Sequence, residues 1–132
     1  MKIINTHRVN SLPEGILFDT DNTLYDYMPA HNAALEAVGK KFENQLSIPR
    51  SKFLESYETS RHQIKNQLGN TASSHSRLLY MQRTMELLGL KSQILLSLEF
   101  EQTYWRTFYG RQSSLKMSSN FLTTLGALVF LW

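Results

Sequence analysis

The chain has 132 residues, of which 42% are hydrophobic and 19% are charged, a composition that fits one globular domain and excludes a disordered or fibrous protein. The formal net charge at pH 7 is only +3 and the basic residues are scattered, so we expect no nucleic-acid partner. The absence of cysteine excludes disulfides and cysteine-ligated zinc, and no apolar run approaches the roughly 20 residues that span a membrane. Residues 1–15 contain no apolar signal segment, so we expect a soluble cytoplasmic protein without a membrane partner.

The first expected element is a short buried strand over 15–19. Ile16, Leu17 and Phe18 stand between turn-forming residues, a pattern typical of a strand that is buried on both faces of a parallel sheet. Near the other end, 121–125 predicts a helical turn or two, and the apolar run 127–131 predicts a second buried strand. A continuous short helix fits the periodicity of that second run as well.

Residues 29–110 show the spacing of amphipathic helices. Pro29 is suited to the start of a first helix, whose apolar stripe is formed by Ala34, Val38 and Phe42. A second helix has Ser51 as its expected N-cap and Gly69 as its stop. Its apolar stripe consists of Phe53, Tyr57, Ile64 and Leu68.

Two further helices are expected in the second half of this region. The third covers about 73–88 and ends at Gly89, with an apolar stripe of Leu78, Met81, Met85 and Leu88. The fourth covers about 92–109 and is followed by Gly110, with an inward stripe of Leu95, Leu98, Trp105 and Phe108. Four amphipathic helices joined by short connections predict a small antiparallel bundle.

The residues that indicate chemistry are aspartates directly after the first expected strand. Asp19 and Asp21 are two positions apart, so extended backbone would send both carboxylates to the same side, at the strand end where open α/β sheets bind ligands. Two carboxylates that close repel each other, and Mg²⁺ commonly relieves the repulsion because it prefers oxygen ligands. Such a site suits phosphoryl transfer. The alternative is a polar turn, in which these residue types are common.

The string Gly15-Ile-Leu-Phe-Asp19-Thr-Asp21-Asn-Thr23-Leu-Tyr25 resembles the first motif of the haloacid dehalogenase superfamily, in which phosphatases predominate. The resemblance implies an α/β (Rossmannoid) core with an inserted four-helix cap, and Mg²⁺-dependent hydrolysis of a small phosphate monoester. It implies that Asp19 is the nucleophile and a metal ligand. It also implies that Asp21 is the general acid/base and that its backbone carbonyl is a second metal ligand. Thr23 is the threonine of the motif, expected to hold the loop and to lie at the substrate. The acid at Asp21 favours a phosphatase over a dehalogenase, because an alkoxide needs a proton to leave and a halide does not.

The resemblance divides the chain into three parts. Residues 1–28 would carry the core strand and the motif, 29–110 the cap, and 111–132 an incomplete return to the core. The later Ser/Thr, Lys and acidic motifs of the superfamily have no match here, so we expect this chain alone to be weakly active or inactive. An incomplete sheet also exposes strand edges, which favours self-association. The alternative function is a non-catalytic helical interaction module or a degenerate fragment.

Two candidate substrate-binding residues lie in the helical region. His75 and Arg77 stand near an expected helix start, where a phosphate or carboxylate group is favoured. The expected ligand is a small phosphorylated metabolite, and both sugar phosphates and nucleotides are candidate substrates. The alternative for these two residues is a solvated polar face. Helical spacing assigns the nearby aromatic residues to the core or rim of the bundle: Tyr57, Tyr80, Tyr104, Trp105 and Tyr109.

Overall fold

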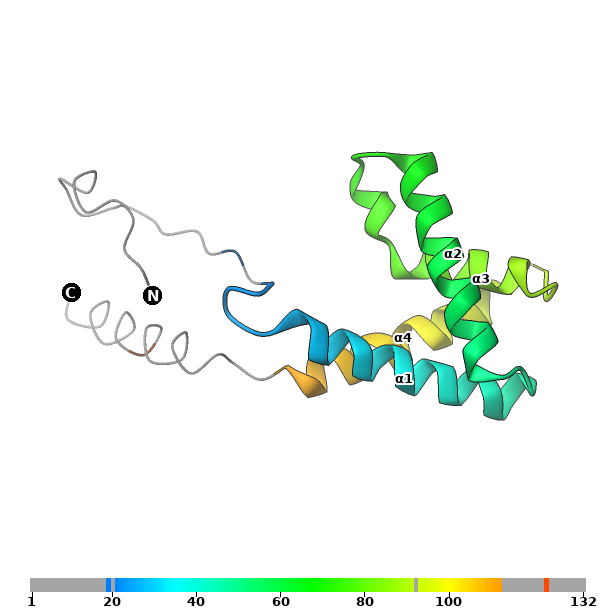
Figure 1. Ribbon diagram of the computed structural model, residues 1–132, viewed down its shortest axis with the longest axis horizontal. Coiled ribbons are helices and arrows are strands. Elements are labelled where there is room, and N and C mark those ends of the chain that lie inside the picture. Colours follow the sequence, from blue (N-terminus) through cyan, green and yellow to red (C-terminus); the bar gives the residue numbers. More distant parts are fainter. Residues whose placement is uncertain (1–18, 20, 92, 113–122, 124–132) are drawn as a thin grey trace. The chain divides into compact units, whose positions relative to one another are not determined.

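The computed structural model describes residues 19, 21–91, 93–112 and 123, and it divides the chain into two compact units. Residues 28–111 form one, which we call the helical unit, and 1–27 together with 112–132 form the other. The elements in chain order are α1 (Tyr27–Leu46), α2 (Arg50–Leu68), the 3₁₀ turn η1 (Ala72–His75), α3 (Arg77–Leu87) and α4 (Ile94–Arg111), as Figure 1 shows.

The described residues contain four packed helices and no strand, apart from an isolated bridge between Asp21 and Tyr25. The strands expected over 15–19 and 127–131, and the helical turns over 121–125, lie outside the described residues except for Asp19 and Thr123. The described part therefore agrees with a helical cap, and the α/β core stays a prediction. None of the described helices is long and apolar enough to cross a membrane.

Helix α1 buries the stripe that the sequence predicts. Ala34, Val38 and Phe42 are fully buried because positions three and four apart share one face of a helix. The helix begins at Tyr27, two residues before Pro29, which is tolerated there because the first turn needs no backbone N–H donor at that position.

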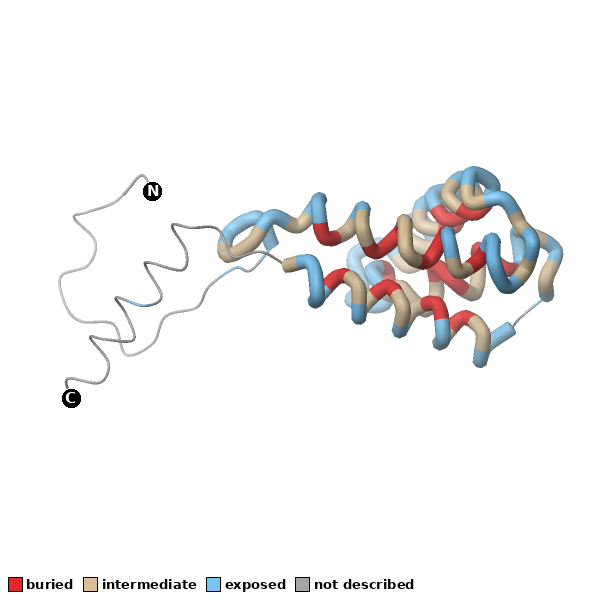
Figure 2. Tube along the Cα trace, turned by 90° about the horizontal axis from the view of Figure 1, so that it is seen from below, coloured by how far each residue is buried: buried red, intermediate tan, exposed pale blue. Residues whose placement is uncertain are grey.

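Helices α1 and α4 run antiparallel and lie side by side (Figures 1 and 2). The rings of Phe42 and Phe100 stack with their centroids 4.6 Å apart. On the exposed side of this pair, Lys41 Nζ lies 2.7 Å from Glu99 Oε1. The antiparallel packing expected from the sequence is thus present in this pair.

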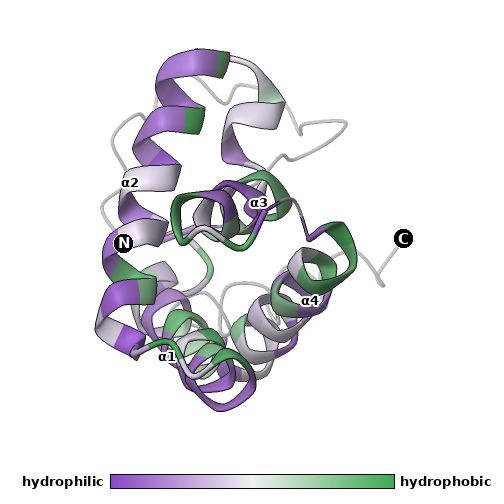
Figure 3. Cartoon of the chain, turned by 90° about the vertical axis from the view of Figure 1, so that its right-hand side faces the viewer, coloured by the Kyte–Doolittle hydropathy of each residue, from purple (hydrophilic) through white to green (hydrophobic). Residues whose placement is uncertain are grey.

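Helix α2 instead crosses the α1–α4 pair steeply, as Figures 1 and 3 both show. The crossing brings the start of α2 close to Gly39 of α1, where an added Cβ would lie 2.6 Å from Cγ of Arg50. The Arg50 guanidinium also contacts the Glu36 carboxylate of α1. A uniform antiparallel bundle is therefore not formed, because the glycine allows α2 to approach α1 closely at one point.

The ends of α2 test two expectations. Gly69 ends the helix with a left-handed φ of +56°, and its N–H donates to the Lys65 carbonyl at 2.9 Å, as expected for a glycine stop. The expected N-cap is wrong: the capping position is Pro49, which makes no side-chain cap, and Ser51 lies inside the first turn.

The third helix begins later than the sequence indicated. Residues 72–75 form the turn η1, and Ser76 takes an extended conformation that separates this turn from α3. The Ser76 hydroxyl accepts a hydrogen bond from the backbone N–H of Leu79 at 3.4 Å, which makes Ser76 the N-cap of α3. Within α3, Met81 and Met85 are buried as predicted.

We expect Ser76→Ala to lower the free energy of unfolding by about 1 kcal/mol, because the first turn of α3 loses its side-chain acceptor. Ser51→Ala is the matched control and should change stability by less than about 0.5 kcal/mol, because Ser51 is exposed and caps nothing. Urea unfolding of the three proteins measures both values. Equal losses in the two variants would contradict the assignment of the cap.

The inward face of α4 differs from the predicted one. Its buried residues are Ser97, Phe100, Tyr104 and Phe108, whereas Leu95 is 83% exposed. Leu98 and Trp105 are half-buried at the margins of this face. The helix also continues through Gly110 to Arg111. Helix α4 has apolar residues of its own on several sides, so periodicity does not determine which side faces inward. The side that carries Phe100, which stacks on Phe42 of α1, is the buried one.

The core of the helical unit is mainly aromatic. Figure 2 shows how its buried residues are distributed along the helices. The core also holds two buried hydroxyls on one acceptor: Ser60 Oγ of α2 and Thr84 Oγ1 of α3 each donate to the Tyr80 carbonyl at 2.7 Å. The aromatic residues expected in the core behave as predicted at Tyr57, Tyr80 and Tyr104, which are fully buried, while Tyr109 is 63% exposed.

Candidate functional site

The described residues that carry the aspartates, 19 and 21–27, form a tight turn that leads into α1, and we call them the aspartate loop. Asn22 has a left-handed φ of +59°, a conformation that asparagine adopts more readily than most residues. Its N–H donates to the Tyr25 carbonyl at 2.9 Å, and its side-chain oxygen accepts the Tyr27 N–H at 3.1 Å. Asn22 therefore closes the turn and joins it to the first residue of α1.

Two hydrogen bonds within this loop hold the two carboxylates. Thr23 Oγ1 donates to Asp19 Oδ2 at 3.2 Å, and the Tyr25 hydroxyl donates to Asp21 Oδ1. Asp19, Asp21 and Thr23 are all exposed. The sequence analysis identified the aspartates and Thr23 as site residues, but it gave no role to Tyr25. The available signal was a side-chain hydroxyl four residues after Asp21.

The donor atoms of the aspartate loop suit a hard cation. Asp19 and Asp21 supply carboxylate oxygens, which are the ligands that Mg²⁺ prefers, and Mg²⁺ often uses only one or two protein carboxylates while keeping several waters. Across the described ranges, no three metal-ligating side chains gather into one group. The loop therefore fits Mg²⁺ by the chemistry of its donors, with two protein carboxylates.

The other two expected site residues, His75 and Arg77, lie in the helical unit. The His75 side chain is exposed at the end of η1, and its carbonyl accepts a hydrogen bond from Arg77 Nη1 at 3.0 Å. The Arg77 guanidinium lies over the rings of Tyr80 and Tyr104, 5.3 Å from each centroid, and 5.9 Å from that of Trp105. The aromatic side chains expected only to fill the bundle thus also hold a cation.

His31 of α1 is a residue that the sequence analysis missed. Its Nδ1 lies 2.6 Å from the hydroxyl of Tyr104. Burial lowers the pKa of His31 to about 4, and the positive charges of Arg77 and Arg61 add to this, while the Glu58 carboxylate opposes it. The sequence does contain a signal for this role. His31 lies three residues before Ala34 and seven before Val38, so helical spacing places this polar residue on the buried side of α1.

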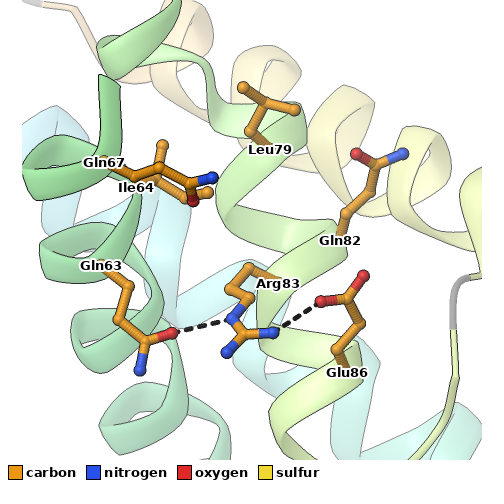
Figure 4. Close-up of a pocket in the computed structure, with 7 residues that line it drawn as sticks. All are labelled: Gln63, Ile64, Gln67, Leu79, Gln82, Arg83 and Glu86. Carbon is orange, nitrogen blue, oxygen red and sulfur yellow. Dashed lines mark hydrogen bonds and ion pairs between the residues drawn. The ribbon is translucent and has the colours of Figure 1, made fainter. Parts of the chain in front are cut away.

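A groove of about 490 Å³ lies between α2 and α3 (Figure 4). Polar side chains dominate its lining: Gln63, Gln67, Gln82, Arg83 and Glu86. Arg83 Nε donates to Gln63 Oε1 at 2.7 Å, and Arg83 Nη1 donates to Glu86 Oε2 at 2.9 Å. None of the site residues expected from the sequence lines this groove.

Comparison with known proteins relates the chain to a phosphatase. It is 33% identical over 99 residues to ribulose-1,5-bisphosphate 5-phosphatase from Halopiger xanaduensis. The aligned part covers 74% of this chain but 41% of that relative, so the chain spans less than half of the relative's length. No protein-family model matches the chain, and no solved structure matches it.

Proposed function

We propose that the chain belongs to the haloacid dehalogenase-like hydrolases and carries part of a Mg²⁺-dependent phosphatase for small phosphate monoesters. The observation that carries this proposal is the aspartate loop, in which Thr23 and Tyr25 each donate a hydrogen bond to one of the two carboxylates. The similarity to a named phosphatase supports the reaction class. The four packed helices agree with a helical cap.

The proposed reaction has two steps. A carboxylate oxygen of Asp19 attacks phosphorus, the bond from phosphorus to the ester oxygen breaks, and Asp21 donates its proton to the departing alkoxide. Asp21 then accepts a proton from a water molecule that attacks the aspartyl-phosphate, which releases inorganic phosphate and restores Asp19. The Asp19 carboxylate and the Asp21 backbone carbonyl would hold Mg²⁺, which would supply positive charge to stabilise the phosphoryl oxygens.

The neighbouring side chains position the two carboxylates. The hydrogen bond from Thr23 orients the Asp19 carboxylate, and Thr23 is also proposed to lie at the substrate. The Tyr25 hydroxyl does the same for Asp21. Because these donors belong to the same short turn as the carboxylates, the geometry is set locally.

The proposed substrate is a small phosphorylated metabolite. The relative's name indicates a sugar bisphosphate as the substrate of that protein, so this compound class is a candidate for the present chain. His75 and Arg77 of the helical unit are the proposed contacts to its anionic groups.

Binding of a phosphoryl mimic tests the proposal. Isothermal titration of the full chain with beryllofluoride in the presence of Mg²⁺ is expected to give saturable binding, because a carboxylate nucleophile binds this mimic in place of the phosphoryl group. Asp19→Asn should remove the binding. Asp26→Asn is the matched control, since it alters an exposed aspartate of the same loop for which no role is proposed, and binding should persist.

Binding that survives in Asp19→Asn would show that the mimic is held elsewhere and would remove the proposed nucleophile. An absence of binding in the native chain would favour the non-catalytic helical module instead.

A further inference from the structure

The groove between α2 and α3 lies within the helical unit and has no part in the reaction proposed above (Figure 4). Helix α2 lines it with Gln63, Ile64 and Gln67, and α3 lines it with residues between Leu79 and Glu86. Its volume of about 490 Å³ falls within the roughly 300–1,000 Å³ that is usual for ligand sites. Polar side chains dominate the lining, so a ligand of this groove is recognised mainly through hydrogen bonds.

The two charged side chains of the lining neutralise each other. Arg83 Nη1 lies 2.9 Å from Glu86 Oε2, and Arg83 Nε donates to Gln63 Oε1 at 2.7 Å, as the dashed lines in Figure 4 mark. A lining without net charge attracts neither a phosphate group nor a cation strongly. The groove therefore suits an uncharged ligand, unlike the phosphorylated metabolite proposed for the aspartate loop.

Three glutamine amides provide most of the hydrogen-bonding capacity of the groove. Each glutamine amide has an acceptor oxygen and two N–H donors. Within the part of the chain that the structure describes, the amides of Gln67 and Gln82 make no hydrogen bond, and Gln63 uses only its oxygen, for Arg83. A peptide group offers the same combination of one N–H donor and one carbonyl acceptor, so these amides match a peptide backbone.

The other lining residues restrict the form of such a peptide. Ile64 and Leu79 are half-buried aliphatic residues that small apolar side chains of a peptide can contact. The described lining contains no aromatic ring, on which proline-rich peptides dock and bases stack, and it is too polar for the apolar face of an amphipathic helix. An extended segment that pairs through its backbone is the mode that agrees with this lining.

We propose that the groove between α2 and α3 binds an uncharged peptide segment in extended conformation. The glutamine amides and Nη2 of Arg83 pair with the peptide backbone. The lining of α3 runs from Leu79 to Glu86, about 10 Å along the helix, which is the length of about three extended residues. The proposal goes beyond the phosphatase function and does not depend on it, because no residue of the aspartate loop takes part.

The test is an NMR titration of the isotope-labelled full chain with trialanine whose two ends are blocked, an uncharged tripeptide. We expect saturable shifts of the side-chain amide resonances of Gln67 and Gln82. The dissociation constant should be on the order of 1 mM, because only a few neutral hydrogen bonds form. An analogue in which an ester replaces the central amide lacks one N–H donor and should bind about two- to tenfold more weakly.

Variants that remove one amide locate the site. Gln67→Leu and Gln82→Leu should each weaken binding of the tripeptide about two- to tenfold, the contribution of one neutral hydrogen bond. Neither amide has a described partner to lose, so both variants should fold. Gln102→Leu is the matched control, because Gln102 is exposed on α4 and does not line the groove, and it should bind as the native chain does.

Two results would overturn the proposal. One is an absence of saturable shifts with the blocked tripeptide, including the case in which maltotriose, a neutral sugar, binds in its place. The other is equal affinity for the tripeptide in Gln67→Leu, Gln82→Leu and Gln102→Leu. Asp19→Asn should bind the tripeptide as the native chain does, whatever its result with beryllofluoride. Loss of tripeptide binding in that variant would place the peptide at the aspartate loop and would also overturn the proposal.

Discussion

Replacing Asp21 with Asn is expected to slow the weak Mg²⁺-dependent hydrolysis of an alkyl phosphate proposed for this chain by about 10²–10⁴-fold, the usual contribution of a general acid. The asparagine retains the size of the side chain and an oxygen that can accept from the Tyr25 hydroxyl. It has no acidic proton to give to the leaving alkoxide. Release of p-nitrophenolate in the first turnover should fall much less, because p-nitrophenolate leaves without protonation. The later hydrolysis of the aspartyl-phosphate uses Asp21 as the base with either substrate and should slow equally for both.

The measurement is the ratio of the rates at which the two leaving groups are released in the first turnover, in the native chain and in the variant. Asp26→Asn serves as the control, and it should leave this ratio unchanged. An equal loss with both substrates would mean that Asp21 acts by binding or metal ligation alone and does not protonate the leaving group.

Phe42→Ala is expected to lower the free energy of unfolding of the helical unit by about 3–5 kcal/mol, the range for removing a fully buried aromatic ring. The Phe42 ring is fully buried between the rings of Phe53 and Phe100, at centroid distances of 4.8 and 4.6 Å. Its removal leaves a cavity where α1, α2 and α4 meet. Chemical denaturation followed by circular dichroism measures the loss.

Leu95→Ala is the corresponding control in α4. Leu95 is 83% exposed, so the truncation should change stability by less than about 0.5 kcal/mol. This pair also tests the inward face of α4, because a loss of 2 kcal/mol or more in Leu95→Ala would return Leu95 to the core, where the sequence pattern placed it.

Much of the helical unit could be predicted because its buried residues follow helical spacing. Val38, Phe42, Met81 and Met85 are buried as expected, because each lies on the apolar face that helical spacing defines in its helix. Helix α4 is different, because its own apolar residues lie on several sides of the helix. Periodicity alone could therefore not exclude Leu95 from the core.

Local sequence rules also failed where a neighbouring residue changed the backbone. Ser51 has the right chemistry for an N-cap, but Pro49 occupies the capping position and the helix begins one residue before Ser51. The separation of η1 from α3 depends on the extended conformation of Ser76, which then caps the second piece. Side-chain preference alone does not determine these boundaries.

The aspartate loop and the contact of His31 were predictable to different degrees. The aspartate loop lies within a few residues of sequence, so its carboxylates and Thr23 could be predicted from the sequence. The contact between His31 and Tyr104 could not, because the two residues are 73 positions apart. Only the packing of the helices brings such residues together.

The pair of hydroxyls on the Tyr80 carbonyl restricts how the helical unit can change shape. Tyr80 and Thr84 both belong to α3, so only the hydrogen bond from Ser60 of α2 joins the two helices, and it favours one register of α2 against α3. Sliding α2 along α3 by one turn, about 5.4 Å, would strand the Ser60 hydroxyl away from its acceptor in the interior, at a cost of about 1–3 kcal/mol. Shear between these helices is therefore disfavoured, and we expect α2 and α3 to move as one rigid body in any conformational transition of the protein.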